Sequence, residues 1–185
     1  MIWSPDIYNK AWEFATRAHK NQTYGGRKED EQIPYLNHIG SVAMEIINAI
    51  QLTNTEFDKN LAIQCALLHD TIEDTIHTYE DIKTLFGKNV ADGVLALTKD
   101  ETLNTKEAMM LDSLDRIKNQ PHEIWMVKMA DRICNLYHPP FYWNNDKKII
   151  YQKEAITIHT ELKSASKYLS ERLLSKIDNY SSFIK

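Results

Sequence analysis

The chain has 185 residues, of which 43% are hydrophobic and 26% are charged, and its formal net charge is −4 at pH 7. A chain of this length and composition can bury a hydrophobic core, so we expect it to be globular rather than disordered. The negative net charge excludes a broadly basic surface of the kind that binds nucleic acid. Five Gly and five Pro are too few for a turn-rich all-β fold.

The cysteines and the N-terminus indicate the compartment. Cys65 and Cys134 lie far apart and form no CxxC pair, which argues against a zinc knuckle or a disulfide framework and predicts a reducing environment. The N-terminal stretch lacks the basic start and apolar segment of a signal peptide. No apolar run approaches the roughly 20 residues that cross a membrane. We therefore predict a cytoplasmic protein without a membrane segment.

The first part of the chain reads as helices separated by one polar segment. Ser4 can cap a helix that has Pro5 at its first position. Residues 21–35 are polar and contain glycine, which predicts a loop or a short hairpin. Apolar residues at helical spacing then predict one helix over about 36–50 and another over about 57–71.

The second part of the chain is also helical by pattern. Thr78 and Asp81 are spaced like a capping box, and Gly87 suits the end of the helix that they begin. No segment alternates at period two for more than a few residues, and the chain has no internal repeat or linker. The sequence therefore predicts a single all-α domain over residues 1–185. Further helical patterns cover 89–98, 105–119, 121–138 and about 146–183, the last as one or two helices.

The stretch CALLHDTIEDT places an imidazole and three carboxylates directly after an apolar run. Burying such charges costs several kcal/mol per group unless they are paired or bind a metal. If the stretch is helical, His69 and Glu73 are neighbours at i,i+4, and so are Asp70 and Asp74. The two aspartates would repel each other at that spacing, and a bound cation would remove the repulsion. The alternative interpretation is a helix end with solvated acids.

Two further residues complete a candidate metal site. His38 and Asp131 each lie inside a helical pattern rich in apolar residues, where an unpaired polar group is unfavourable. Each alone would suit a satisfied core residue, but with His69 and Asp70 they form a set of two His and two Asp. Mixed imidazole and carboxylate ligands favour Mn(II) or Fe(II), with Zn as an alternative.

These residues, in this order, resemble the four ligands of the HD-domain metallohydrolases. The segments AHKNQ, GGRKEDEQIPYLNH, ALLHDTIEDT, FGKNVADGVLALTK and VKMADRICNL resemble, more specifically, the hydrolase domain of RelA/SpoT homologues. That domain removes the 3′-diphosphate of the alarmone ppGpp. The resemblance covers about residues 11–155 and implies a helical bundle of about eight to ten helices. The chain stops before a synthetase domain could fit, so we expect a stand-alone small alarmone hydrolase.

The resemblance implies roles for individual residues. It makes Mn2+ the metal, held by His38, His69, Asp70 and Asp131. It makes Glu73 and Asp74 the acids that activate the attacking water, with a small nucleotide as substrate and GDP or GTP and pyrophosphate as products. The residues that it places near the nucleotide are Arg27 and Lys28 in a basic loop, and Asn135 and Tyr151 near ribose and phosphate.

The chain departs from the family pattern at three places. Asn21 replaces the Gly of an H-x-G-Q pattern, and Ile39 replaces the usual Pro after the first metal-binding His. The family also has an Arg shortly after the position of Asn135, which this chain lacks. We expect Lys147 or Lys148 to compensate for that missing cation.

Other interpretations stay open at this point. Arg27 and Lys28 precede an acidic run, so they also suit a solvated mixed-charge loop. The substrate could be another nucleotide, such as ppApp or NADPH, and the sequence does not separate guanosine from adenosine. A non-catalytic nucleotide-binding regulator is a further alternative, against which the intact HDTIED argues. The sequence makes no prediction about the oligomeric state.

Overall fold

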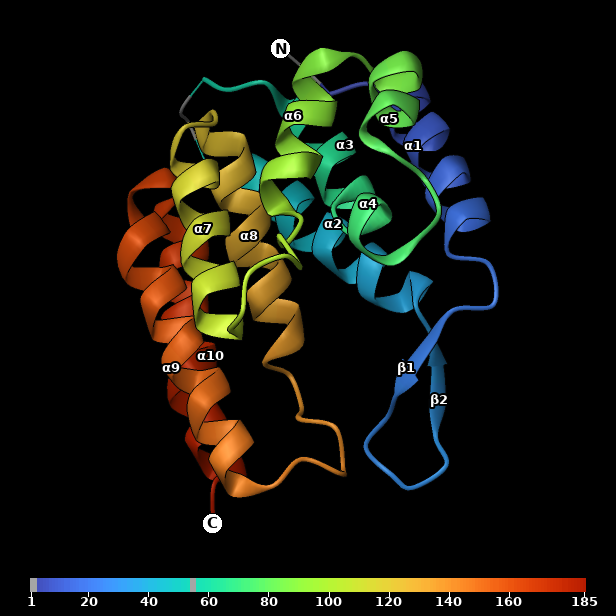
Figure 1. Ribbon diagram of the computed structural model, residues 1–185. Coiled ribbons are helices and arrows are strands. Elements are labelled where there is room, and N and C mark those ends of the chain that lie inside the picture. Colours follow the sequence, from blue (N-terminus) through green and yellow to red (C-terminus); the bar gives the residue numbers. More distant parts are fainter. Residues whose placement is uncertain (1–2, 54–55) are drawn as a thin grey trace.

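Helices form nearly all the regular structure of the chain (Figure 1), for which a computed structural model describes residues 3–53 and 56–185. The all-α prediction is confirmed. Within the described part of the chain, the strands are two three-residue segments. The elements are α1 (Pro5–Ala18), β1 (Thr23–Gly25), β2 (Gln32–Pro34), α2 (Leu36–Leu52), α3 (Lys59–Leu68), α4 (Thr71–Asp74), α5 (Tyr79–Phe86), α6 (Lys88–Leu97), α7 (Lys106–Lys118), α8 (His122–Asn135), α9 (Asn145–Leu162), η1 (Lys163–Ala165), α10 (Lys167–Tyr180) and η2 (Ser181–Phe183).

The helix caps read from the sequence are present in the structure. The Ser4 hydroxyl accepts a hydrogen bond from the backbone N–H of Ile7 at the start of α1. At α5, the Thr78 hydroxyl accepts from the Asp81 N–H, and the Asp81 carboxylate accepts from the Thr78 N–H at 2.8 Å. These bonds satisfy backbone donors that the first helical turn leaves without partners.

The continuous helix predicted over 57–71 is wrong at both ends. Asp58 caps α3 by accepting from the N–H groups of Asn60 and Leu61, so the helix begins at Lys59. It ends at Leu68, and Asp70 has left helical geometry at φ −98° and ψ 2°. The chain then makes the single turn of α4. The break separates the predicted ligands His69 and Asp70 from the acidic pair Glu73 and Asp74, which lies on the short helix α4.

The core lies where α2, α3 and α8 pack together, with α6 laid across α3 and α8. The close approach of α6 depends on Gly93. A Cβ added there would lie 2.5 Å from Ile124 Cδ1 on α8 and 2.9 Å from Cys65 Sγ on α3. Ile39, the residue that replaces the family proline, is fully buried in this core, so it contributes packing that a proline would not supply.

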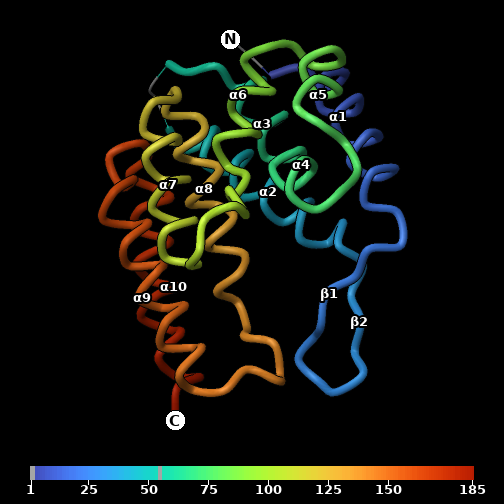
Figure 2. Tube along the Cα trace, viewed as in Figure 1, coloured from blue at the N-terminus to red at the C-terminus, as the bar shows by residue number. Residues whose placement is uncertain are grey.

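The segment 21–35 forms a short antiparallel hairpin, in line with the prediction of a loop or a hairpin. Strand β1 pairs with β2 with Tyr24 opposite Ile33. Figure 2 shows the hairpin reaching away from the helices, across from the connection between α8 and α9. Asn21 enters it at φ 67°. Asn tolerates this left-handed conformation better than most residues, which explains why it can stand in the glycine position.

The C-terminal segment is two long helices, α9 and α10, joined by η1. Helix α10 packs on α8, α9 and α2. Arg172 of α10 donates from Nε and Nη2 to the buried carboxylate of Glu45 on α2, at 2.5 Å each. Its Nη2 also lies 2.7 Å from the Tyr137 hydroxyl just beyond α8. Among the described residues, no helix is long and apolar enough to cross a membrane.

Candidate active site

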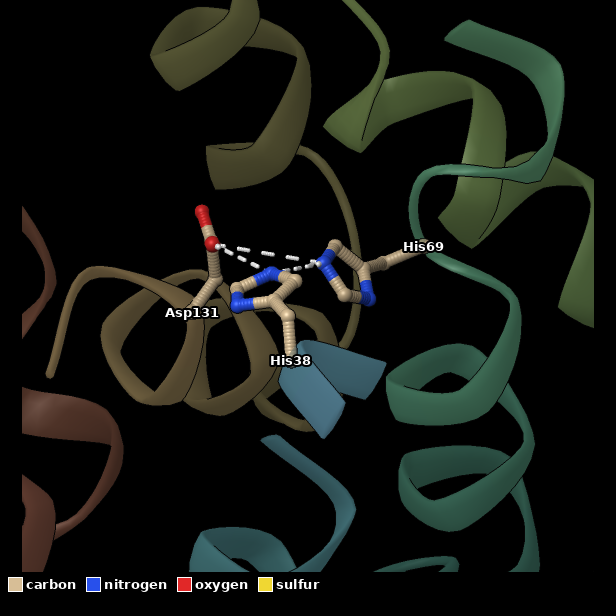
Figure 3. A group of neighbouring side chains, drawn as sticks. All are labelled: His38, His69 and Asp131. Atoms are coloured by element: carbon tan, nitrogen blue, oxygen red, sulfur yellow. Dashed lines mark hydrogen bonds and ion pairs between the residues drawn. The ribbon is translucent and has the colours of Figure 1, made fainter. Parts of the chain in front are cut away.

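Three predicted metal ligands converge from three helices (Figure 3). His38 comes from the first turn of α2, His69 follows the end of α3, and Asp131 lies on α8. Their ligand atoms all lie within 4.8 Å of one another. The two Nε2 atoms are 3.2 Å apart, and Asp131 Oδ1 is 3.4 Å from that of His38. This is one compact set of nitrogen and oxygen donors.

Asp70, the fourth predicted ligand, borders this cluster. Its Oδ2 lies 2.9 Å from His69 Nε2 and 3.6 Å from His38 Nε2. The same oxygen accepts a hydrogen bond from the Tyr35 hydroxyl at 2.5 Å. A phenol that donates to a ligating carboxylate fixes its orientation, as partners outside a metal's ligand shell commonly do.

The tautomer of His69 suits metal binding. Its Nδ1 lies 2.9 Å from the carbonyl oxygen of Ala66. A carbonyl only accepts, so Nδ1 carries the hydrogen and Nε2 is left with its lone pair toward the other donors. Because the ring is only 3% exposed, this orientation is held by packing as well as by the hydrogen bond.

The electrostatics of the metal-free cluster show how strongly it favours a cation. Burial lowers the pKa of His38, but the carboxylates of Asp131 and Asp70 outweigh this effect and raise it to about 10. Burial raises the pKa values of Asp70 and Asp131, but the two imidazoles hold both well below the usual range, and at Asp131 the Lys128 ammonium contributes as well. In the absence of a metal, the proton held on His38 supplies positive charge to these buried carboxylates. The donor set therefore fits a divalent cation.

The acidic pair on α4 is held by different partners. Glu73 forms an ion pair with Lys99, and its Oε2 also accepts the backbone N–H of Lys99 at 2.9 Å. Asp74 Oδ2 lies 3.4 Å from the amide nitrogen of Gln22. Burial and then the Asp70 carboxylate raise the pKa of Asp74. The two acids thus lie beside the metal-binding cluster in unlike surroundings.

Two adjoining cavities lie at this cluster. The first, here called the acidic cavity, has a volume of about 240 Å³. The second, here called the aromatic cavity, has about 500 Å³ and lies between the hairpin and the segment after α8. Tyr35 and Asn135 line both, so the cavities meet there. The acidic cavity is lined by Tyr35, His69, Asp70, Glu73, Asp74, Leu97, Lys99, Lys128, Asp131 and Asn135.

The predicted substrate residues are distributed unevenly around the aromatic cavity. Arg27 and Tyr151 line it, whereas Lys28 is not among its lining residues. Tyr151 carries the guanidinium of Arg132 4.0 Å above its ring. Asn135 lies at the junction and donates from Nδ2 to Asp131 Oδ1 at 2.6 Å. It therefore contacts the metal-binding cluster as well as the cavity.

The two lysines expected to replace the family arginine differ in position. Lys148 donates to the carbonyl oxygen of Phe183 at 3.1 Å, which directs it to the C-terminal segment. Lys147 Nζ lies 4.3 Å from the ring centroid of Trp143, a residue of the aromatic cavity. Of the two, only Lys147 lies beside that cavity.

Sequence reasoning missed three polar residues of the acidic cavity, which are Tyr35, Lys99 and Lys128. Lys128 had a local signal, because it precedes Asp131 by one helical turn, and its Nζ lies 3.6 Å from Asp131 Oδ2. Tyr35 and Lys99 had none. Their partners, Asp70 and Glu73, lie on other elements of the chain.

The HD domain family matches residues 11–165, and the chain belongs to this family. Its members depend on metal, and His38, His69 and Asp131 lie together as such a site requires. The resemblance to HD-domain hydrolases related to SpoT is confirmed. The guanosine-3′,5′-bis(diphosphate) 3′-pyrophosphohydrolase MESH1 of Danio rerio is 31% identical over 164 residues, covering 86% of each chain. The human MESH1 is 31% identical over 171 residues, covering 89% of each chain.

Two other relatives place this match in context. The GTP pyrophosphokinase rsh of Brucella melitensis is 32% identical over 169 residues, which cover 86% of this chain but 21% of that protein. A solved structure described as a metazoan orthologue of SpoT that hydrolyses ppGpp has a TM-score of 0.79 and 23% identity. It matches 97% of this chain and 98% of its own length, which shows a shared fold.

Proposed function

We propose that this chain hydrolyses the 3′-diphosphate of guanosine alarmones such as ppGpp and pppGpp, with Mn2+ as its metal. The observation that carries the proposal is the junction of the two cavities at Asn135 and Tyr35. A diphosphate suits the side with the metal-binding cluster, and a nucleoside suits the aromatic side. The names of the MESH1 relatives describe this reaction for those proteins.

The metal would be held by His38, His69, Asp70 and Asp131. Manganese bound there would polarise the diphosphate and lower the pKa of a coordinated water. The Tyr35 hydroxyl holds the Asp70 carboxylate, and the Ala66 carbonyl holds the His69 ring. The chain therefore presents its ligands with little freedom to rearrange.

The acids of α4 are proposed to handle the attacking water. Water adds to the phosphorus that carries O3′, the P–O3′ bond breaks, and O3′ takes up a proton as pyrophosphate leaves. Asp74 lies at the cavity wall with Gln22 as a neutral partner, which suits a group that accepts the proton of water. Glu73 is held by Lys99 at both oxygens, which suits a group that orients the water.

The aromatic cavity is proposed to receive the nucleoside. Tyr142, Trp143 and Tyr151 offer ring faces or edges to a purine, and Arg27 offers a cation that can stack on a base or bind a phosphate. Its volume of about 500 Å³ is in the range of small-molecule sites. Guanosine is favoured over adenosine only by the relatives, so the experiment has to compare both.

The test is a substrate panel with the manganese-loaded protein. ppGpp, pppGpp, ppApp and NADPH are supplied separately, and released pyrophosphate and phosphate are both measured. We expect one pyrophosphate per ppGpp and no free phosphate, with GDP as the other product. Asp74→Asn is the control, because it should retain the metal yet lose about 10²- to 10⁴-fold in turnover. Faster release of pyrophosphate or phosphate from ppApp or NADPH would show that one of these is the substrate instead. If none of the four compounds is hydrolysed, the chain is a nucleotide-binding protein rather than an enzyme.

A further inference from the structure

Lys99 is an unassigned cation at the reacting end of the cavities. It directly follows Thr98, the C-cap residue of α6, and it lines the acidic cavity together with Asp131 of α8. Lys128 lines the same cavity from α8. In the described part of the chain, Lys99 and Lys128 supply the ammonium groups that line the acidic cavity.

The backbone at Lys99 is fixed from two sides. Its N–H donates to Glu73 Oε2 at 2.9 Å, which ties it to α4. On the other side, Arg116 of α7 donates to the carbonyl oxygens of Leu95 and Thr98 at 2.6 and 2.7 Å. These bonds satisfy carbonyls that the end of α6 would leave without partners. Lys99 is therefore held at the cavity wall before any substrate arrives.

The Lys99 ammonium has donors to spare. An ammonium has three N–H donors, and in the described part of the chain Nζ donates to a single protein acceptor, Glu73 Oε1. The side chain is 47% exposed and lines the acidic cavity, so an anion bound there can reach its other donors. An ion pair with a purely structural role does not need unused donors that face a cavity, whereas a binding site for an anion does.

The charge balance of the acidic cavity calls for these lysines. Its lining includes four carboxylates, those of Asp70, Glu73, Asp74 and Asp131, against two ammonium groups. The formal charge of −2 is just balanced by a divalent cation. If both lysines were neutral, the cavity would stay negative with the metal bound and would repel a diphosphate.

We propose that Lys99, with Lys128 in the same cavity, binds the diphosphate group that is released as pyrophosphate, and that Glu73 holds Lys99 in place for this contact. The inference rests on the proposed function for the identity of the anion. Lys99 would then be a substrate-binding residue outside the HDTIED segment. Glu73 would position Lys99 in addition to orienting the attacking water. Lys99 contacts the diphosphate itself, whereas Arg116 acts only through the backbone carbonyl oxygens of Leu95 and Thr98.

The test measures binding of inorganic pyrophosphate to the manganese-loaded protein, which needs no turnover. Lys99→Met should weaken this binding about tenfold or more, the loss expected for one charge-assisted hydrogen bond. Lys99→Arg should retain much of it. Lys118→Met is the matched control, since Lys118 pairs with Asp115 and Glu161 at 3.0 Å on the surface. Metal content and melting temperature are measured on the same samples.

A purely structural role for Lys99 gives a different result in the Glu73→Gln background. If Lys99 only balanced the charge of Glu73, its replacement would no longer matter there. We expect the loss of pyrophosphate affinity from Lys99→Met to persist in the double variant. Unchanged affinity in Lys99→Met, or a loss that vanishes with Glu73→Gln, would overturn the proposal. A chain that binds pyrophosphate through Lys99 but does not hydrolyse ppGpp would instead refute only the proposed function.

Discussion

Metal binding should release a proton, because His38 must become neutral to act as a ligand. In the metal-free protein, burial lowers the pKa of His38, but Asp131 and Asp70 raise it to about 10. For each pH unit below that pKa, removing the proton from His38 costs about 1.4 kcal/mol. At pH 7 the apparent Mn2+ affinity should therefore be about 10³-fold lower than at a pH high enough for His38 to be neutral. It should rise about tenfold per pH unit between pH 7 and pH 9 for one displaced proton.

The stability of the metal-free protein should change in the opposite direction. A pKa raised from 6.5 to about 10 stabilises the folded state fully below pH 6.5, and this contribution is lost as the pH rises to about 10. The metal-free protein should therefore become less stable over the range in which manganese binds more tightly. Chemical unfolding of the chelated protein at several pH values measures this trend.

Titration calorimetry of Mn2+ into the chelated protein tests the proton count. Runs at one pH in two buffers of different ionisation enthalpy give the number of protons released, which we expect to be about one or more per metal at pH 7. Asp131→Ala serves as the control, because it removes a ligand and should bind little manganese. An affinity that does not change with pH, with no proton released, would refute the reasoning.

Three further predictions concern the cavity wall and the packing of helices. Arg27→Ala should raise KM for ppGpp about tenfold. Lys28→Ala should change KM little, because of these two residues only Arg27 lines the aromatic cavity. Equal effects of the two variants on KM would contradict this assignment. Arg172→Met leaves the Glu45 carboxylate buried without its cation. The free energy of unfolding should fall by about 3 kcal/mol, which lowers the melting temperature by about 6–12 °C. An unchanged melting curve would show that the ion pair contributes nothing to stability. Gly93→Ala should lower the free energy of unfolding by about 1–3 kcal/mol, because the added Cβ would lie 2.5 Å from the Ile124 side chain. Denaturant unfolding measures this change. A gain in stability would mean that α6 can shift to make room for the methyl group.

The helices could be predicted because their determinants are local. Apolar residues repeat every three to four positions, and caps such as Ser4 and the pair Thr78 and Asp81 act within one turn. The break after Leu68 was not predicted, since CALLHDTIEDT contains no Gly or Pro to mark it. Packing of His69 and Asp70 toward α2 and α8 decided the backbone there.

The residue types of the candidate site were also readable from the sequence. His38, His69, Asp70 and Asp131 stood out as polar residues in or beside apolar helical patterns, and their order matched a family motif. The family motif also implied that the four share one site, but the distances between them were not readable. The structure brings three into one cluster and places Asp70 at its border with Tyr35 as partner.

Only the tertiary structure determined what surrounds those residues. Glu73 and Lys99 are 26 positions apart, Tyr35 and Asp70 are 35 apart, and Glu45 and Arg172 are 127 apart. No periodicity or spacing rule links residues so distant, because a pattern reports the face of one element and not the neighbour that the face meets. The two cavities follow from the same cause. They are formed where the hairpin, α4, α6 and α8 come together, and the packing of the core determines that arrangement.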